Sequence, residues 1–355
     1  MIAQRATPNG RRRRTTLADV AKAAGVSTST ASRALRDHPR VSAATRQRVV
    51  AIADQLGFAR NDLARSLRLQ ASMLVGVVVP DVAIPFYASV LKGAQSRLEG
   101  AGYEVLVMNT EREPAREQRA LRTLQSRQVD AVLVATSGGF APLDVPVVFF
   151  DHVLTGAGAG AVAPDNEAGM SLLVEHLADI HGHRRIAFLG APVTSAPGAA
   201  VLEGGPAYER REAFRAAMGR RGLPVAPEYL ACADHGWSQA AAERAVAGLL
   251  GLSDPPTAIV AAGDTLALGA LRALRRHGRA VPADVALVSF DDPEDADLLS
   301  SPLTALGRHD RELGDLAAEL LLRALAGEPA EPEPVRLTLQ LVVRRSCGCG
   351  AQAAS

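Results

Sequence analysis

The twenty residues TLADVAKAAGVSTSTASRAL, numbered 16–35, decide the first part of the fold. Thr16, followed three residues later by Asp19, forms a capping-box pattern that predicts the start of a helix. Gly25 suits the left-handed position that ends a helix, and Ser27 can cap a second one. Two short helices around such a turn are typical of a helix-turn-helix unit, whose second helix enters the major groove of DNA.

The outward face of this second predicted helix carries Thr28, Ser29, Arg33 and Arg36. Short hydroxyls can approach base edges closely, and a guanidinium matches guanine O6 and N7 with two hydrogen bonds. The competing interpretation is a small helical bundle with a solvated basic face, which would normally carry long Glu and Lys side chains. A third helix, capped by Ser42, completes the unit.

The charge is distributed unevenly along the chain. The 355 residues contain 39 Lys and Arg against 38 Asp and Glu, but residues 1–70 carry a net +10 and the remainder a net −9. A basic front joined to an acidic body indicates domains with different partners, and the front is a candidate for binding nucleic acid.

A hydrophobic content of 48% excludes disorder throughout. No apolar run matches a membrane span or a signal peptide, so we expect a cytoplasmic protein without membrane contact.

Residues 58–69 connect the front to the body. Asn61 is a candidate N-cap, and Leu63 and Leu67 are four residues apart. A helix of about two turns is marginal in water, so we expect it to order only when something packs on it. The alternative is an ordinary amphipathic connector.

The body alternates short apolar runs with helical stretches from residue 74 onward, which indicates parallel sheets with helices on both faces. Such strands could form one large sheet, a barrel or two smaller sheets, and a Gly- and Ala-rich break near 156–164 favours two lobes. The predicted strands are Leu74–Val79, Val105–Met108, Ala131–Ala135, Val147–Phe150, Ile186–Leu189, Tyr229–Cys232, Ala258–Ala262 and Val285–Phe290. The predicted helices lie near 87–100, 114–128, 166–180, 207–221, 239–251 and 265–277.

Ligands of such folds bind beyond the carboxyl ends of the strands, so the residues that follow each run are candidate contacts. Aromatic side chains could cover an apolar ring face, while Arg210 and Asp291 could bind hydroxyls or a charged group. The candidates are Phe86, Tyr87, Ser137, Asp151, Arg210, Trp237, Asp264 and Asp291. Three of these candidates have an alternative role. Asp264 could be a helix N-cap, Trp237 could belong to the core of an interface, and Asp291 could be one of a solvated acidic cluster.

The sequence offers little for catalysis or metal binding. No lysine follows a glycine as a P-loop requires, and no Gly-x-Ser-x-Gly elbow occurs. His176 and His181 are five residues apart, where two ligands on one α-helical face need four, so a helix end is the expected role. Cys347 and Cys349 supply two thiols where structural zinc usually needs four ligands. We therefore expect no enzyme, no cofactor and no metal.

Residues 16–35, followed by Val41-Ser42 and Thr45-Arg46, resemble the DNA-binding head of the lac repressor (LacI/GalR) family. The resemblance implies that Thr28, Ser29 and Arg33 read bases. It also implies a hinge helix that orders on the operator, with Leu67 as a minor-groove wedge and a small residue, Ala64, one turn earlier. The full set of expected DNA-binding residues is Thr16, Ser27, Thr28, Ser29, Ser32, Arg33, Arg36, Arg40, Asn61, Ala64 and Leu67.

The body resembles the same family through GHRRIA (182–187), GDTLALGA (263–270) and SFDD (289–292). This resemblance implies a periplasmic-binding-protein-like fold of two lobes joined by three crossings, with Arg210 and Asp291 as polar effector contacts and Phe86, Tyr87 and Trp237 lining the cleft. The chain departs from the family pattern at Ile84, where many members have asparagine.

The expected protein is a repressor that binds a palindromic operator as a homodimer, or as a tetramer, under control of a small-molecule effector, a sugar or sugar derivative. A solute-binding protein would share the body but has no need of residues 15–69. The expected parts are a disordered basic arm (1–14), a helix-turn-helix domain (15–59), a hinge helix and linker (60–71), an effector-binding and dimerisation body (72–346) and a tail (347–355). Lobe 1 is expected over about 72–163 and 308–330, and lobe 2 over about 164–305 and 335–346.

Overall fold

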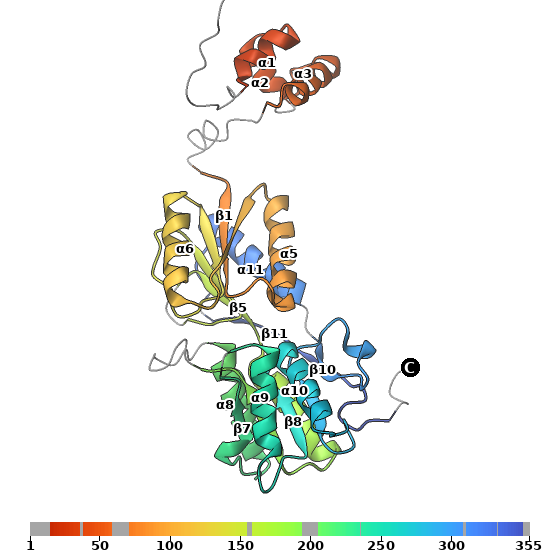
Figure 1. Ribbon diagram of the computed structural model, residues 1–355. Coiled ribbons are helices and arrows are strands. Elements are labelled where there is room, and N and C mark those ends of the chain that lie inside the picture. Colours follow the sequence, from red (N-terminus) through yellow and green to blue (C-terminus); the bar gives the residue numbers. More distant parts are fainter. Residues whose placement is uncertain are drawn as a thin grey trace, which may run out of the picture. The chain divides into compact units, whose positions relative to one another are not determined.

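The computed structural model describes residues 15–35, 38–58, 71–154, 158–193, 205–234, 236–307, 310–331 and 333–350. The chain forms two compact units, Met1–Ser72 and Met73–Ser355. We call them the head and the body and describe each by itself (Figure 1). In the described residues, no helix has the length and apolar character that crossing a membrane requires.

The head is a bundle of α1 (Leu17–Ala24), α2 (Thr28–Ala34) and α3 (Ala43–Gln55). The predicted capping box is confirmed, because the Thr16 hydroxyl accepts from the backbone N–H of Asp19 and the Asp19 carboxylate accepts from the backbone N–H of Thr16. Gly25 has φ +65°, a left-handed conformation that glycine adopts without steric cost. Ser27 and Ser42 cap α2 and α3 as predicted. Small side chains let the three helices pack closely, and the buried set is Val20, Ala21, Ala24, Ala31, Ala34, Val41, Val49 and Ala53.

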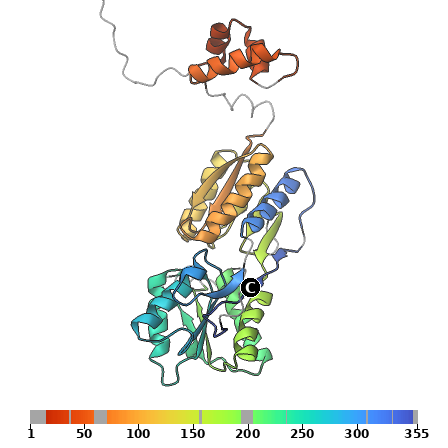
Figure 2. The same ribbon diagram turned by 90° about the vertical axis from the view of Figure 1, so that its right-hand side faces the viewer.

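The first lobe of the body contains a six-stranded sheet of order β11-β5-β4-β3-β1-β2, in which all paired strands are parallel. Its strands are β1 (Leu74–Val79), β2 (Glu104–Asn109), β3 (Ala131–Val134), β4 (Val147–Phe150), β5 (Gly160–Pro164) and β11 (Val335–Leu337). Helix α6 (Pro114–Ser126) covers one face, and α5 (Pro85–Gly100) with α11 (Asp310–Leu325) covers the other (Figures 1 and 2). Two apolar clusters, one on each side of the sheet, account for its almost continuously apolar central strands.

The second lobe contains a sheet of order β12-β10-β9-β8-β6-β7, in which only β12 runs antiparallel. Its strands are β6 (Ile186–Gly190), β7 (Leu230–Cys232), β8 (Ala258–Ala261), β9 (Ala286–Ser289), β10 (Thr304–Gly307) and β12 (Gln340–Val342). Helices α7 (Asn166–Glu175) and α8 (Pro206–Arg220) pack together on one face, and α9 (Gln239–Leu250) and α10 (Asp264–Arg276) on the other (Figure 2). The predicted two-lobe arrangement with parallel sheets is therefore confirmed.

The chain passes between the lobes from β5 to α7, from β10 to α11 and from β11 to β12. Two expectations about this region were wrong. The stretch 160–164, expected as part of a break between lobes, is β5, whose last four residues are buried because their small apolar side chains pack in the sheet. Residues 335–337, expected in lobe 2, form an edge strand of the first sheet.

The end of helix α7 also differs from expectation. Residues His176–Ile180 form η1, a π-helical turn that continues α7.

The segment after β12, expected as a tail from residue 347, partly belongs to the second lobe, because Cys347 is buried in the core of that lobe. Its neighbour Ser346 donates through its hydroxyl to the carbonyl of Leu287 at 2.6 Å, which ties the segment to β9.

Candidate functional site

The exposed face of α2 carries the residues expected to read bases. Thr28, Ser29 and Arg33 are exposed, while Ala31 and Ala34 on the opposite side are buried. The Ser27 hydroxyl accepts from the backbone N–H of Thr30 at 3.1 Å and so is occupied as a cap. Short side chains over the first turn leave the helix N-terminus accessible, as entry into a major groove requires.

The other expected DNA contacts have mixed outcomes. The Thr16 hydroxyl donates to the Asp19 carboxylate at 2.7 Å, so the structure shows a capping role for it. Arg40 is exposed and Ser32 is half-buried. The remaining four expected contacts, Arg36, Asn61, Ala64 and Leu67, lie outside the described residues.

A second candidate site lies between the two lobes of the body, where the carboxyl ends of their strands meet. It is a cavity of about 30 Å³ with aromatic, acidic and basic lining residues. The lining residues are Ile84, Phe86, Tyr87, Arg112, Asp151, Pro206, Arg210, Trp237, Asp264, Thr265 and Asp291. Seven of the eight expected effector contacts therefore lie together. They lie beyond the carboxyl ends of the strands, where open parallel sheets bind their ligands.

Asp151 follows β4 and has a left-handed backbone with φ +62°, which a non-glycine residue adopts only where its surroundings hold it there. Its side chain is buried, and its Oδ2 accepts a hydrogen bond of 2.9 Å from the hydroxyl of Tyr87. Its Oδ1 has no hydrogen-bond partner among the described residues. Burial, reinforced by the Asp151 charge, raises the pKa of Tyr87 well above its usual value, so this hydroxyl remains a proton donor.

Arg210, on the first turns of α8, joins the two lobes at the cleft. Its guanidinium donates to Asn166 Oδ1 at 3.0 Å, to the carbonyl of Ala262 at 2.6 Å and to Asp291 Oδ1 at 3.4 Å. It also lies 4.0 Å from Asp151 Oδ1, across the cleft. The buried cation therefore offsets the charge of carboxylates from both lobes, which lowers the cost of burying them.

Trp237 lies against Gly263, where a Cβ would come within 2.8 Å of the indole ring. A glycine at this position thus lets the ring enter the cleft. The guanidinium groups of Arg112 and Arg210 each lie 5.9 Å from the centre of the ring, within range of a cation–π interaction.

One expected contact, Ser137, and one alternative role, that of Asp264 as an N-cap, need correction. Ser137 does not line the cavity, and its backbone N–H donates at 2.5 Å to Glu117, a buried carboxylate on α6. Asp264 does line it but is not the N-cap of α10, because that position falls on Gly263. The Asp264 carboxylate instead accepts from the backbone N–H of the next residue, Thr265, at 2.5 Å.

Sequence reasoning missed Arg112, which follows β2 and has φ +58°. Its position beyond a strand's carboxyl end was the available signal. It also missed a chain of contacts behind Arg210. Asn166 donates to Glu209 at 2.5 Å, and Arg336 on β11 donates to both oxygens of Glu209 at 3.0 Å. These residues lie at or beside the crossings between the lobes, which no local pattern marks.

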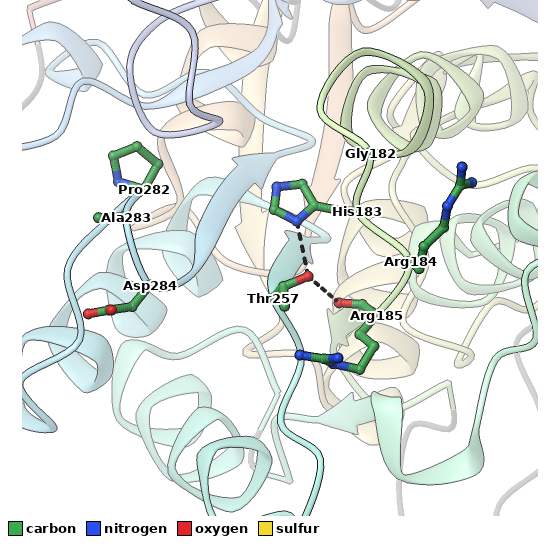
Figure 3. A pocket seen from close by; sticks show the side chains of 8 residues that line it. All are labelled: Gly182, His183, Arg184, Arg185, Thr257, Pro282, Ala283 and Asp284. Atoms are coloured by element: carbon green, nitrogen blue, oxygen red, sulfur yellow. Dashed lines mark hydrogen bonds between the residues drawn. The ribbon is translucent and has the colours of Figure 1, made fainter.

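A larger hollow of about 420 Å³ lies at the opposite edge of the second sheet, before β6, β8 and β9 begin (Figure 3). His183 and Thr257 make a 3.0 Å contact on its wall, and Thr257 donates to the carbonyl of Arg185 at 3.3 Å. The hollow is open, and its lining combines few apolar groups with exposed arginines, so its size alone does not make it the effector site.

Both units of the chain match families of known proteins. Residues 16–61 match the family model described as bacterial regulatory proteins, lacI family, and residues 174–347 match the periplasmic binding protein-like domain. The ribose operon repressor of Escherichia coli (strain K12) is 30% identical over 339 residues, which cover 93% of this chain and 99% of the repressor.

Solved structures show the same likeness over both units. The lac repressor dimer bound to operator and the anti-inducer ONPF is 28% identical with a TM-score of 0.79, covering 94% of this chain and 99% of that one. The complex of the transcriptional regulator CelR with cellobiose is 29% identical with a TM-score of 0.67, covering 94% of this chain and 100% of that one. The protein is a DNA-binding transcription regulator and not an enzyme, and the chain belongs to the lacI family of bacterial regulatory proteins.

Proposed function

We propose that the protein is a repressor that binds a palindromic operator as a homodimer, and that a neutral carbohydrate in the cleft changes its affinity for that operator. The operator part is supported by the exposed face of α2 and by the likeness to a lac repressor dimer bound to operator. The effector part is supported by the convergence of aromatic and charged groups between the lobes.

On DNA, arginines of the head contact phosphates and Thr28, Ser29 and Arg33 read base edges. Phosphate contacts release counterions, so the affinity falls steeply with salt while base preference does not. By the family resemblance, Leu67 wedges into the minor groove and bends a flexible central base step of the operator. The net negative body keeps the lobes off DNA.

The chemistry of the cleft favours a neutral, hydroxyl-rich ligand. Three carboxylates line it, of Asp151, Asp264 and Asp291, against two guanidinium groups, of Arg112 and Arg210. Carboxylates accept hydrogen bonds from sugar hydroxyls but repel phosphate or carboxylate ligands. Apolar faces of a sugar ring can rest on aromatic side chains. A carbohydrate satisfies both halves of this lining.

Binding of such a ligand changes the arrangement of the lobes. Sites for small molecules measure roughly 300–1,000 Å³, whereas this cavity is about 30 Å³. The lobes must therefore separate or shift to accept a sugar. Because Arg210 is hydrogen-bonded to Asn166 at one crossing and connects through Glu209 to Arg336 at another, the shift reaches the segments that join the lobes. The effector thereby favours one of two body conformations.

The observation that carries the effector proposal is the buried Oδ1 of Asp151, a residue that lines the cleft, because this atom lacks a hydrogen-bond partner among the described residues. Buried polar atoms are ordinarily bonded, so a ligand hydroxyl is the partner expected for it. Trp237 is the only tryptophan in the sequence, and its fluorescence therefore reports occupancy of the cleft without a label.

The test is a titration of the full-length protein with mono- and disaccharides, followed by Trp237 fluorescence. We expect a saturable change with one sugar class. Asp151→Asn should weaken that response at least about tenfold, since hydrogen bonds to charged groups are worth about 1.5–3 kcal/mol. Asp254→Asn, which alters an exposed ion pair with Arg185, should leave it unchanged.

Selection of bound DNA from a random pool, with and without the responding sugar, then gives the operator sequence and the sign of the response together. A palindromic consensus supports the dimer on DNA. Selection of no consensus would contradict the repressor proposal, and a consensus whose recovery no sugar changes would contradict the effector proposal alone.

A further inference from the structure

Four side chains that the functional proposal does not use converge at the end of α7. His176 and His181 come from the π-helical turn η1 and the residue after it, and Cys347 and Cys349 come from the last described segment of the chain. One ligand-type atom from each, imidazole nitrogen or sulfur, lies within 4.8 Å of the other three. Two of the residues are buried and two are partly buried.

The π turn explains why sequence spacing was misleading. On an α-helix, residues five apart point about 140° away from each other. A π turn closes i to i+5, so residues five apart fall on the same side. Nε2 of His176 and Nε2 of His181 are accordingly 3.3 Å apart, and the expectation that this spacing separates them was wrong.

Three of the six distances between these atoms are close to the edges of a tetrahedral metal site. Zinc bonds of about 2.05 Å to nitrogen and about 2.3 Å to sulfur place ligands about 3.3 Å apart for N–N, about 3.6 Å for N–S and about 3.8 Å for S–S. Besides the 3.3 Å N–N separation, Sγ of Cys349 lies 3.3 Å from Nε2 of His181 and 3.7 Å from Nε2 of His176.

The surroundings hold the cysteine pair in place. The hydroxyl of Thr304 on β10 donates to Sγ of Cys347 at 3.1 Å, as a donor to a metal-bound thiolate does. Gly348, between the cysteines, has φ +105°, and a Cβ there would come within 3.4 Å of the His181 ring. The positive φ, which other residues rarely adopt, favours glycine where the chain turns to present both sulfurs to the histidines.

We propose that His176, His181, Cys347 and Cys349 form a structural zinc site that fastens the C-terminal segment to the end of α7 in the second lobe. Two thiolates and two imidazoles are a borderline-soft tetrahedral donor set, typical of zinc sites in which the protein fills all four positions. Binding of Zn²⁺ releases the two thiol protons and leaves both histidines neutral.

The role expected for the two histidines, at the end of a helix, is the one that His277 has in the same lobe. His277 ends α10, and its Nδ1 contacts the carbonyl of Ala273 within its own helix at 2.8 Å. His176 and His181 instead contact each other and a sulfur about 170 residues away along the chain. Cys232, on β7, is exposed and outside the cluster, which makes His277 and Cys232 matched controls.

The experiment uses the full-length protein purified without a histidine tag and kept reduced, with metal content measured by mass spectrometry. We expect about one zinc per chain. Cys349→Ser and His181→Gln should each lower this at least about fivefold, while Cys232→Ser and His277→Gln retain it. Cobalt substitution should give a thiolate charge-transfer band that Cys349→Ser weakens and Cys232→Ser preserves.

Two control measurements separate loss of zinc from loss of folding. Cys349 is partly exposed, and its serine variant should keep the circular dichroism of the wild type. Wild-type protein stripped by a chelator should regain both one zinc and its original melting temperature when zinc is added back. Reduced, folded wild-type protein that carries no zinc and takes up none would overturn the proposal, as would equal metal loss in the Cys349→Ser and Cys232→Ser proteins.

Discussion

The hydroxyl of Tyr87 donates a 2.9 Å hydrogen bond to Asp151 Oδ2, and both side chains are buried although they lie 64 residues apart. This bond gives one oxygen of the carboxylate a donor within lobe 1, while the other oxygen lies 4.0 Å from the guanidinium of Arg210 in lobe 2. The pair therefore sets both the direction of the carboxylate and the cost of burying it.

Tyr87→Phe should lower the free energy of unfolding by about 1–3 kcal/mol, because it leaves a buried carboxylate oxygen without its donor. Urea unfolding followed by circular dichroism measures this. Tyr103→Phe in the same lobe, at a partly buried position, is the control and should cost less than half as much. Equal decreases in the free energy of unfolding for the two variants would show that the Tyr87–Asp151 hydrogen bond does not stabilise the fold.

We expect the buried His152 to make the free energy of unfolding depend on pH. Burial lowers its pKa below the usual value, with Arg112 and Arg210 acting in the same direction and Asp151 and Glu209 opposing it. The unfolded chain therefore binds this proton more readily, so the contribution of His152 to the free energy of unfolding falls as pH drops below about 6.5 and is constant above it. His152→Gln should flatten that slope in urea unfolding between about pH 5 and 8, and an unchanged slope would contradict this role of His152.

Arg336→Gln should uncouple the effector from DNA. The change removes the bidentate contact between β11 and Glu209 while leaving every residue that lines the cavity in place. Sugar affinity measured by Trp237 fluorescence should change less than about threefold, while the sugar-induced change in operator affinity should shrink by about 0.5–2 kcal/mol. Arg323→Gln, which alters only the exposed pairs with Glu328 and Glu331, is the control. An unchanged sugar response in Arg336→Gln would remove this residue from the coupling.

Gly93 permits the close packing of α5 on α11. A Cβ at this position would lie 1.9 Å from the carbonyl oxygen of Arg311, so the helices would have to move apart. Gly93→Ala should therefore lower the free energy of unfolding by about 1–3 kcal/mol. Gly100→Ala at the end of the same helix meets nothing within 4 Å and should cause no loss. Comparable unfolding midpoints for the two variants would contradict the packing explanation.

Arg33→Ala should cost about 1–3 kcal/mol in affinity for the selected operator and relax the preference at one base pair. Fluorescence anisotropy on the operator, on single-base variants and on random DNA measures both effects. Arg48→Ala, at an exposed position on α3, should leave the base preference unchanged. If Arg33→Ala weakened operator and random DNA by the same factor, Arg33 would contact phosphate and not bases.

The sequence by itself determined the elements whose signals are local. The capping box at Thr16, the left-handed Gly25 and the serine caps lie within a few residues of the helices that they delimit, so they could be read without knowing the fold. The alternation of apolar runs with helical stretches likewise predicted α/β lobes with helices on both faces of a parallel sheet, and strand ends predicted seven cleft residues because parallel strands align their carboxyl ends.

Tertiary structure alone decided which distant groups meet. Arg336 reaches Glu209 across 127 residues, and Cys349 reaches His181 across 168, and neither contact leaves a periodic signal in the sequence. The π turn η1 follows α7 and changes which side His181 faces, and residues 335–337 join the first sheet as an edge strand. Caps and periodicity act within one or two turns of chain, whereas the cleft and the histidine–cysteine cluster depend on how the chain crosses between the lobes and returns.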